Sequence, residues 1–481
     1  MKRKLNYIWM AIALTTASCD SMLEVEPRTY IESEQALNSV LGVEAAINGA
    51  YANIRNSAYY GLGIIVYPEL LADNARLVQA ATQSGRGVGY DVNNPGTHLN
   101  IWTQAYSTIN RANLVLASVD AVSDGTEAQK SSFKAQAYFL RALVYFDLLK
   151  TYAYNPNYIQ EGADIGVPLL TEGIDDLTKI TLPERSTIVA GYQLVEQDLL
   201  AAISSFQQTG VNAKEGAPYY GTKGAAHALL SRLYLYWGAD KWTSCVEQAD
   251  LAIAEGVGVF QASPSAYLSM WTQPSNPESV FEVQFANINE VPQTSNNNTI
   301  QAFYQQERNG AQLLGWGDVV MANNFLSLFE EGDARRQVVV PYTRANGEQV
   351  LQTDKFSGSK GIFGWDNVPV IRVSEVYLNR AEAYARLGNT TSAQADLNLI
   401  RTRAGLPAIA PAGSALIDAV LKERRLELAF EGQRFFDLTR LGTEIPKENI
   451  SPIPFSDYRI LAPIPQSELD INTNLIQNRG Y

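Results

Sequence analysis

The chain is poor in the side chains that most often carry catalysis. Its 481 residues include only two histidines and two cysteines, and neither pair is close in the sequence. A histidine-rich metal site and a thiol activated by histidine both need such residues to be clustered. The sequence also lacks a glycine-rich phosphate loop and a nucleophile-elbow motif. We therefore expect no catalytic residue, no metal ligand and no cofactor.

Positive charge is also scarce. Lysine and arginine together number 37, against 50 aspartates and glutamates, which gives a formal net charge of −13. This charge would repel a phosphate backbone, and no basic stripe with interleaved aromatic residues offsets it. The composition is nevertheless that of a folded protein, with 46% hydrophobic residues and 25 tyrosines. We expect a globular protein that does not bind nucleic acid.

No hydrophobic run is long enough to span a bilayer, which needs about 20 residues. The apolar stretch from Leu5 to Thr16 follows three basic residues and precedes Ala17-Ser18-Cys19, which is the layout of a secretory leader. Small residues before the cysteine resemble the bacterial lipobox, although Thr16 stands where leucine is usual. We predict a signal peptide over residues 1–18 and a lipid such as palmitate on Cys19. The alternative is ordinary cleavage with an unmodified cysteine.

The other cysteine and both histidines have structural interpretations. Cys245 lies in an amphipathic helical pattern, which favours a small buried core residue. His227 stands among alanines and leucines and is expected in the core of a helix, whereas His98 is expected in a loop with its hydrogen bonds satisfied. Trp102 shares a helical face with Ile109, so we favour core packing over stacking on a ligand.

Helical periodicity dominates the rest of the chain. Residues 133–150 are typical of a long buried helix. Tyr234 and Gly238 recur at the same spacing as Tyr384 and Gly388, and a second amphipathic helix follows each glycine. Glycine suits the sharp turn that ends the first helix of such a pair. This is the plan of tetratricopeptide units, but long insertions separate the two examples. We predict paired helices that support loops, without a regular superhelix. One apolar helical face comprises Val43, Ile47, Tyr51 and Ile54.

A few strands are also expected. Residues 279–285 alternate in hydrophobicity, and residues 338–343 and 350–355 flank Asn346-Gly347, a strong hairpin signal. The predicted fold class is therefore mainly α, with tetratricopeptide-like helical pairs forming a scaffold that carries long loop insertions and minor β hairpins.

The most carboxylate-rich segment runs from Glu423 to Leu438. Glu423, Glu427 and Glu431 recur at i, i+4 spacing. A glycosidase would need two carboxylates about 5–9.5 Å apart across a cleft. Opposite charges at helical spacing usually pair locally instead. We favour a structural ion-pair helix over a catalytic pair. The expected local partners are Arg424, Arg425 and Arg434.

Three stretches are rich in turn residues and polar aromatics, namely residues 56–67, 85–100 and 287–318. Long loops in a compact protein are often functional. A tryptophan or tyrosine can cover the apolar face of a sugar ring, while amides, carboxylates or arginine bind its hydroxyls. Ordinary loop packing is the alternative for each residue taken singly. The candidate ligand contacts in and beside these loops are Tyr59, Tyr60, Asp73, Asn74, Tyr90, Asp91, Asn287, Asn289, Tyr304, Arg308 and Trp316.

Several motifs follow one another in the C-terminal third. Residues 372–384 read RVSEVYLNRAEAY, residues 398–406 read NLIRTRAGL, and residues 427–434 read ELAFEGQR. APIP at 462–465 and QNRGY at 477–481 complete the order. In this order the motifs resemble the SusD/RagB family of outer-membrane nutrient-binding lipoproteins, whose ending more often reads Pro-Gly-Tyr. The N-terminal half agrees more loosely, so the resemblance spans nearly the whole chain.

The resemblance implies helical pairs beneath a loop-rich binding face. It also implies a partner, a TonB-dependent transporter of the SusC type, over which the lipoprotein forms a lid. Glycans are the usual cargo of the family and peptides that of some members, but the motifs locate no ligand contact. We predict a SusD-like N-terminal region over residues 19–275 that packs with a C-terminal region over residues 276–481 as one unit. We expect this unit to be lipid-anchored to the cell outer membrane and exposed at the surface.

Three functions follow from these observations. The first is nutrient capture without catalysis, which the aromatic loops and the scarcity of catalytic groups favour. The second is an interaction scaffold or transporter lid that binds no ligand itself, which the helical pairs suggest. The third is a surface glycosidase, which would need a carboxylate pair at a cleft.

Overall fold

The structure is a computed structural model that describes residues 37–80, 83–160, 162–208, 217–291, 298–308, 311–312 and 315–481. The predicted signal peptide and Cys19 lie outside the described residues. The helices are α3 (Val40–Ile54), α4 (Gly63–Leu71), α5 (Trp102–Ser118), α6 (Glu127–Tyr152), α7 (Ile188–Gln208), α8 (Lys223–Trp237), α9 (Trp242–Glu255), α10 (Pro264–Met270), α11 (Ile300–Tyr304), α12 (Asn323–Leu326), α13 (Val373–Arg386), α14 (Thr390–Arg403), α15 (Ser414–Glu427), α16 (Arg434–Arg440) and α17 (Gln466–Ile471). The strands are β1 (Ala75–Leu77), β2 (Ser279–Val283), β3 (Glu307–Arg308), β4 (Ala311–Gln312), β5 (Val319–Met321), β6 (Val339–Thr343), β7 (Gln349–Thr353) and β8 (Val368–Arg372).

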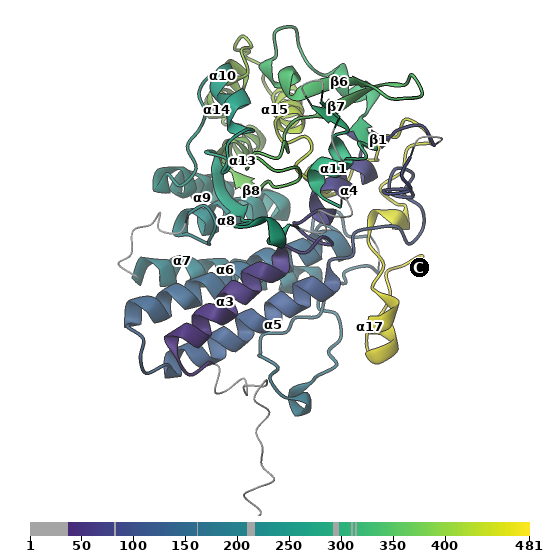
Figure 1. Ribbon diagram of the computed structural model, residues 1–481. Helices are drawn as coiled ribbons and strands as arrows, with labels where there is room; N and C mark the ends of the chain where they lie inside the picture. The colour runs from purple at the N-terminus through teal and green to yellow at the C-terminus, as the bar shows by residue number, and fades with distance from the viewer. Residues whose placement is uncertain are drawn as a thin grey trace, which may run out of the picture.

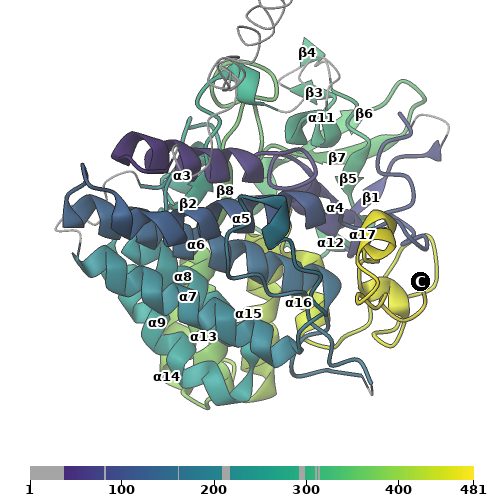
Figure 2. The same ribbon diagram turned by 90° about the horizontal axis from the view of Figure 1, so that it is seen from below.

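Most of the long helices form one series. Helices α3, α5, α6, α7, α8, α9, α13 and α14 each pack against the next one in that order. Figure 2 shows them lying side by side from α3 at one edge to α14 at the other. Residues 256–372 are inserted between α9 and α13, yet these two helices still pack together. The predicted scaffold of helical pairs is therefore present, and the insertion does not interrupt it.

The two predicted helix-turn-helix units are confirmed as the pairs α8–α9 and α13–α14. Gly238 follows α8 with φ of +103°, and Gly388 follows α13 with φ of +79°. These left-handed values favour glycine, which explains why the residue recurs at both turns. Cys245 is buried between the pairs, where its thiol lies 3.7 Å from the carbonyl oxygen of Asn379. His227 is buried in α8 and contacts Gln248 through Nδ1.

The expected apolar faces lie in the core. Ile47 and Ile54 of α3 are buried, as is Trp102 of α5, whose ring contacts Tyr152. Helix α6 begins at a capping box, in which the side chains of Thr126 and Gln129 bind each other's backbone N–H groups. Its residues from 135 onward are mostly buried, as predicted for the segment 133–150. A single hydrophobic cluster joins residues from Leu37 to Ile464.

The strands form small antiparallel pairs. The predicted hairpin at Asn346-Gly347 is confirmed, since β6 pairs with β7 and Gly347 has φ of +85°. Strand β2 pairs with β8, and all residues of both strands are buried. The alternation of hydrophobicity in residues 279–285 therefore predicted the strand correctly, but the strand is buried on both faces and not on one. Helix α8 packs against both strands, which accounts for the burial of their second face.

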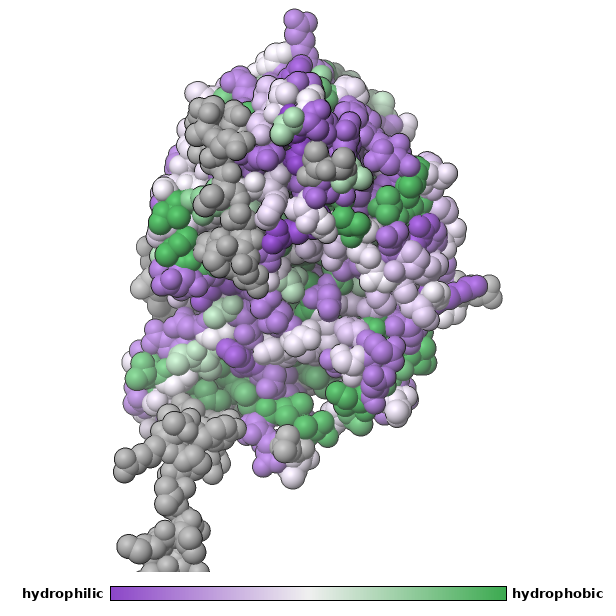
Figure 3. Space-filling model, turned by 45° about the vertical axis from the view of Figure 1, so that its right-hand side comes forward, coloured by the Kyte–Doolittle hydropathy of each residue, from purple (hydrophilic) through white to green (hydrophobic). Residues whose placement is uncertain are grey.

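The inserted residues and the C-terminal segment build the rest of the molecule. Figure 1 shows the small strands and short helices such as α11 above α3, α5, α6 and α7, with α17 running down one side. Two of the predicted loops contain regular structure, because α4 begins at Gly63 and residues 287–318 include α11, β3 and β4. Hydrophobic residues on the face in Figure 3 form patches separated by hydrophilic residues. None of the helices in the described ranges combines the length and apolarity that crossing a membrane requires.

Candidate functional site

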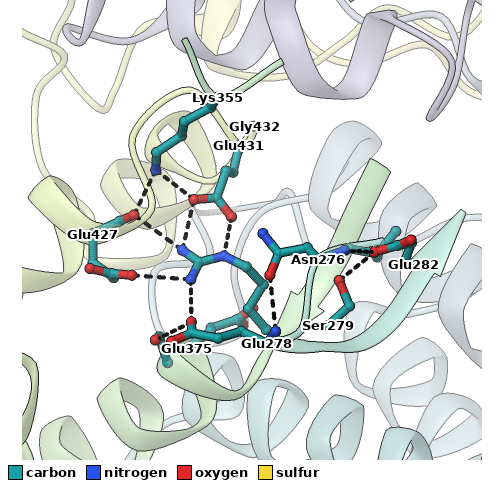
Figure 4. A network of polar contacts seen from close by, with 12 residues as sticks. Asn276, Glu278, Ser279, Glu282, Lys355, Glu375, Glu427, Glu431 and Gly432 are labelled. Atoms are coloured by element: carbon teal, nitrogen blue, oxygen red, sulfur yellow. Dashed lines mark hydrogen bonds and ion pairs between the residues drawn. The ribbon is translucent and has the colours of Figure 1, made fainter. Parts of the chain in front are cut away.

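The carboxylate-rich segment lies inside the protein. Glu423 and Glu427 of α15 are at most 1% exposed, and Glu431 follows them in a buried turn. The Arg372 guanidinium lies 3.1 Å from Glu427 and 2.7 Å from Glu431, and Lys355 lies 2.7 Å from Glu431. Figure 4 shows this network, in which carboxylates and basic groups from separate elements converge. The segment pairs its charges as predicted, but it is not the single helix expected, because α15 ends at Glu427 and α16 begins at Arg434, with Phe430 and Gly432 at positive φ between them.

The expected local partners were wrong. Glu423 pairs with Arg335 and Arg401, both at 2.7 Å, and Glu427 with Arg403 in addition to Arg372. Burial opposes ionisation of Glu427, but Arg403, Arg372 and Arg335 together hold its pKa below the usual value for glutamate. These carboxylates are enclosed by basic groups, so they do not face each other across an open cleft.

The arginines of the segment bind elsewhere. Arg424 pairs with Asp437 at 2.9 Å, while Arg425 and Arg434 both bind the candidate residue Asp73, at 3.0 and 2.6 Å. Burial opposes ionisation of Asp73, but the two arginines bring its pKa below the usual value. The neighbouring candidate Asn74 also binds Arg425, at 2.8 Å through its side-chain oxygen. Asp73 and Asn74 thus tie the end of α4 to the C-terminal motifs.

The candidate tyrosines of the first loop are in the core. Tyr59 and Tyr60 donate hydrogen bonds of 2.6 and 2.7 Å to one carboxylate oxygen of Asp147, and their rings stack. Tyr304 is fully buried and its hydroxyl donates to the carbonyl oxygen of Ile65 at 3.3 Å. The side chains of all three are occupied by internal contacts and do not reach the surface.

Two other candidates, Tyr90 and Trp316, each belong to a ring contact, and we call the residues of these two contacts, Tyr67, Arg86, Tyr90 and Trp316, the Trp316 platform. Burial raises the pKa of Tyr67 and the charge of Arg86 lowers it, so the two contacts adjoin each other. The rings of Tyr67 and Tyr90 stack with centroids 3.8 Å apart and planes inclined by 10°. The Arg86 guanidinium lies 4.8 Å from the centroid of the Trp316 ring, which is 38% exposed. Each of the three predicted loops therefore contributes one or two side chains to a single surface.

Hydrogen bonds hold the platform in place. The backbone N–H of Ser84 donates to Asp318 at 2.7 Å, which joins the second loop to the third. Arg344 donates to the carbonyl oxygens of Trp316 and Gly317, at 3.2 and 2.9 Å. The N–H of Trp316 donates to the carbonyl oxygen of Ala302 at 2.8 Å. The exposed tryptophan is thus fixed by its backbone, which suits a preformed binding surface.

Asp91 and His98 lie in the same loop as Tyr90. Burial raises the pKa of Asp91, although Lys447 acts in the opposite direction. Burial lowers the pKa of His98 to about 3, so its ring is neutral near pH 7. Its Nδ1 accepts a 2.8 Å hydrogen bond from the N–H of Leu99, while Nε2 has no partner among the described residues. The prediction of a fully satisfied histidine was therefore only half right.

The remaining candidates are Asn287, Asn289 and Arg308. Asn287 and Asn289 are exposed in a short 3₁₀ turn, and the side chain of Asn287 caps this turn by accepting the N–H of Asn289 at 3.0 Å. Asn289 also lines a surface groove with Arg55 and Glu290. Arg308 lies in β3, and its side chain lies outside the described part of the structure.

Two family models match the chain. The SusD family model matches residues 349–481, and a model described as "Starch-binding associating with outer membrane" matches residues 17–235. A SusD-like protein of Formosa agariphila is 24% identical over the full length of both chains. A solved SusD superfamily protein of Bacteroides thetaiotaomicron is 27% identical, with a TM-score of 0.80 over 92% of this chain and 99% of that one. The chain belongs to the SusD/RagB family.

One further relative carries a ligand in its name. The starch-binding protein SusD of Bacteroides thetaiotaomicron is 28% identical over 163 residues, which cover 28% of this chain and 29% of that protein. In the present SusD/RagB chain, the sequence motifs that indicated the family lie mainly in the interior. Arg372, Glu375 and Glu427 are each at most 2% exposed. The family motifs therefore build the scaffold, whereas the Trp316 platform lies on α4 and two loops.

Sequence reasoning missed two members of the platform. Tyr67 ends the first predicted loop and Arg86 lies between Gly85 and Gly87 in the second. The two glycines could have indicated a tight turn at Arg86, since Gly85 and Gly87 both have positive φ. Nothing in the sequence indicated that Arg86 would lie over Trp316, because the two residues are brought together only by the tertiary structure.

Proposed function

We propose that this SusD/RagB protein is a surface lipoprotein that captures an oligosaccharide without transforming it and delivers it to a SusC-type TonB-dependent transporter. The observation that carries the proposal is the Trp316 platform, a preformed aromatic surface built by α4 and two loops. The starch-binding name of one relative and the outer-membrane description of one family model support the same function. The burial of the carboxylate-rich segment in ion pairs supports capture without hydrolysis.

The platform suits a sugar chemically. A pyranose ring can lay its C–H face on an exposed aromatic ring, and nearby polar groups can then bind its hydroxyls. The exposed part of the Trp316 ring and the half-buried ring of Tyr90 provide the aromatic surface, while Arg86 provides a polar group. The stacking of Arg86 on Trp316 orients the guanidinium, so less side-chain entropy is lost when a ligand binds.

The candidate residues then divide into groups. We propose Tyr90 and Trp316 as contacts on the platform, and Asp91 as a contact beside Tyr90 in the same loop. We propose Asn289 as a contact on the separate groove, Asn287 as an exposed contact at the same 3₁₀ turn, and Arg308 as a further contact from β3. The buried candidates act as supports for the binding loops in this proposal. These supports are Tyr59, Tyr60, Asp73, Asn74 and Tyr304.

The rest of the predicted organisation belongs to the same proposal. Removal of residues 1–18 would leave a lipid on Cys19, and this lipid would hold residues 19–275 and 276–481 near the transporter as one unit. Several acyl chains would give stable attachment, because a single chain binds only marginally. A Cys19→Ala variant should be released from membranes, and the wild type should incorporate labelled palmitate. Absence of the label would remove the anchor from the proposal.

Calorimetry on the purified lipoprotein tests the binding function. Titration with a panel of neutral and acidic oligosaccharides should give binding to at least one, and Trp316→Ala should weaken it by roughly tenfold. Leu251→Ala, which removes an exposed side chain from α9, should leave it unchanged. A flat titration for every sugar would reject capture.

Reducing-end assays should stay at background, and any sustained rise would favour the glycosidase hypothesis instead.

A transporter pull-down separates capture from a pure scaffold. If the protein captures glycans, Trp316→Ala should lower nutrient uptake while still recovering the transporter. If uptake is unchanged although the calorimetric affinity falls, the platform does not serve transport and the scaffold hypothesis gains support.

A further inference from the structure

A polar hollow lies against α3, and its lining includes none of the residues of the Trp316 platform. We call it the Tyr220 groove, and its two adjoining parts have volumes of about 240 and 460 Å³. Arg55 and Glu290 line both parts, so the two parts meet at this ion pair. Hollows of a few hundred Å³ are the usual size for small-ligand sites. The size alone therefore permits a short oligosaccharide.

The ion pair is held in a defined orientation. Arg55 Nη1 lies 3.0 Å from Glu290 Oε2 and donates to the carbonyl oxygen of Gln284 at 3.3 Å. The same Glu290 oxygen accepts the N–H of Ala286 at 2.6 Å. Both side chains are about a quarter exposed, at 24% and 25%. Within the described residues, Oε1 of Glu290 and the other guanidinium nitrogens of Arg55 have no hydrogen-bond partner. An acceptor and several donors thus remain available side by side.

Aromatic and amide groups stand beside the pair. Tyr220 is 36% exposed, and its ring rests edge-on against Tyr51 with centroids 5.0 Å apart. Its hydroxyl lies 3.2 Å from the side-chain oxygen of Asn48. Tyr219 lines the same part of the groove, and Asn53 and Asn289 line the other. The groove therefore combines a ring held in place with amides and a paired charge.

A partly exposed ion pair contributes little to stability, usually less than about 1 kcal/mol. Stability alone thus gives a weak account of a pair that lies where two hollows meet. Neighbouring hydroxyls on a sugar match the pair well, because one can donate to the carboxylate while the next accepts from the guanidinium. The two charges cancel each other, which favours a neutral ligand over an acidic or a basic one.

We propose that the Tyr220 groove is a second binding site for a neutral oligosaccharide. A pyranose ring packs on Tyr220, and its adjacent hydroxyls bind Arg55 and Glu290. This inference rests on the proposed capture of glycans but not on the Trp316 platform. The segment 287–318 contributes Asn289 and Glu290 to the groove and Trp316 to the platform, so both sites are built on the same inserted segment.

Calorimetry with neutral trisaccharides of glucose, mannose and xylose measures the number of sites. The probes are short so that one molecule is held at one site. The wild type should bind two molecules of one of them per chain, and Tyr220→Ala and Trp316→Ala should each bind one. Tyr220→Phe, which keeps the ring and loses the bond to Asn48, should retain two. Thermal unfolding should show that each variant is folded, since Tyr220 is partly exposed.

Charge selectivity gives a second and independent readout. Glu290→Gln leaves the Arg55 charge without its partner, so the groove should bind a trigalacturonate probe roughly tenfold more tightly than the wild type does. In the Arg55→Ala, Glu290→Gln double variant this gain should disappear. A purely structural ion pair would give no such gain.

The outcomes distinguish the two proposals. If Tyr220→Ala binds the trisaccharide with the stoichiometry of the wild type, or if Glu290→Gln gains no affinity for the acidic probe, the second site is wrong and capture at the platform stands. If Trp316→Ala retains full affinity while Tyr220→Ala abolishes binding, the groove is the principal site and the platform proposal fails. If no sugar binds the wild type, both proposals are overturned.

Discussion

The Arg86 guanidinium lies over the ring of Trp316, 4.8 Å from its centroid. This contact joins two loops that are far apart in the sequence, and both loops are also linked through Ser84 and Asp318. It fixes the orientation of the exposed tryptophan and leaves part of its ring open to solvent. The Arg86–Trp316 contact and the Ser84–Asp318 hydrogen bond together explain how a surface carried largely by loops can be preformed.

Arg86→Ala should lower the affinity for the captured oligosaccharide by about two- to fivefold. The expected size follows from exposed cation–π contacts, which are worth about 0.5–1 kcal/mol. Calorimetry with the best-binding sugar measures the change, and Arg336→Ala is a control because Arg336 is exposed and belongs to neither binding surface. An unchanged affinity in Arg86→Ala would show that the contact does not organise the platform.

Glu427→Gln should destabilise the protein strongly. Glu427 is fully buried and pairs with Arg372 and Arg403, so the neutral side chain leaves buried positive charge without compensation. Breaking a buried ion pair on one side usually costs about 3–5 kcal/mol. Urea unfolding gives the free energy of unfolding. Glu127→Gln is the matched control, because Glu127 is 89% exposed beside Lys130 and should change stability by less than about 1 kcal/mol. Equal effects of the two substitutions would contradict this account.

The helical scaffold could be predicted from the sequence because its signals are local. Apolar spacing places Ile47 and Ile54 on one face of a helix, and a glycine at a helix end suits positive φ wherever that helix packs. The ion pairs could not be predicted in the same way. Glu427 lies four residues from both Glu423 and Glu431, but it binds Arg372, which is 55 residues away in the sequence. Helical spacing contains no information about such a partner.

The candidate site shows a similar division. The sequence predicted Trp316 and Tyr90 as ligand contacts because aromatic side chains in long loops can cover the apolar face of a sugar ring. Tyr59 and Tyr60 carry the same signal, but their hydroxyls bind Asp147 in the core. A loop that folds inward and one that faces solvent can have the same composition. Only the positions of their hydrogen-bond partners in the fold distinguish the two cases.

Acid should destabilise the protein partly through Glu382. Burial alone would raise the pKa of this carboxyl, but Arg440, Arg386 and Arg424 lower it to about 2. Because the folded pKa lies below the unfolded value of about 4.5, ionised Glu382 stabilises the fold above pH 4.5. This contribution is lost as pH falls from about 4.5 to 2, and a shift of this size corresponds to about 3 kcal/mol. Urea unfolding at pH 6, 4 and 2.5 measures the free energy of unfolding of the wild type and of Glu382→Gln. The difference between the two should become smaller as the pH falls. A constant difference would contradict the assignment.

Gly432→Ala should destabilise the turn that follows α15. Gly432 has φ of +76°, and a Cβ there would lie 2.1 Å from the carbonyl oxygen of Ile64, so backbone must move against backbone. Movement would also weaken the 2.9 Å hydrogen bond from the N–H of Gly432 to Glu69, whose pKa burial raises to about 7. Positive φ alone costs alanine about 1–2 kcal/mol, and the clash adds to it. Gly347→Ala is the matched control, since Gly347 also has positive φ but a Cβ there meets nothing within 4 Å. Thermal unfolding should show a clearly larger loss for Gly432→Ala, and similar losses at both positions would mean that the turn can relax around the methyl group.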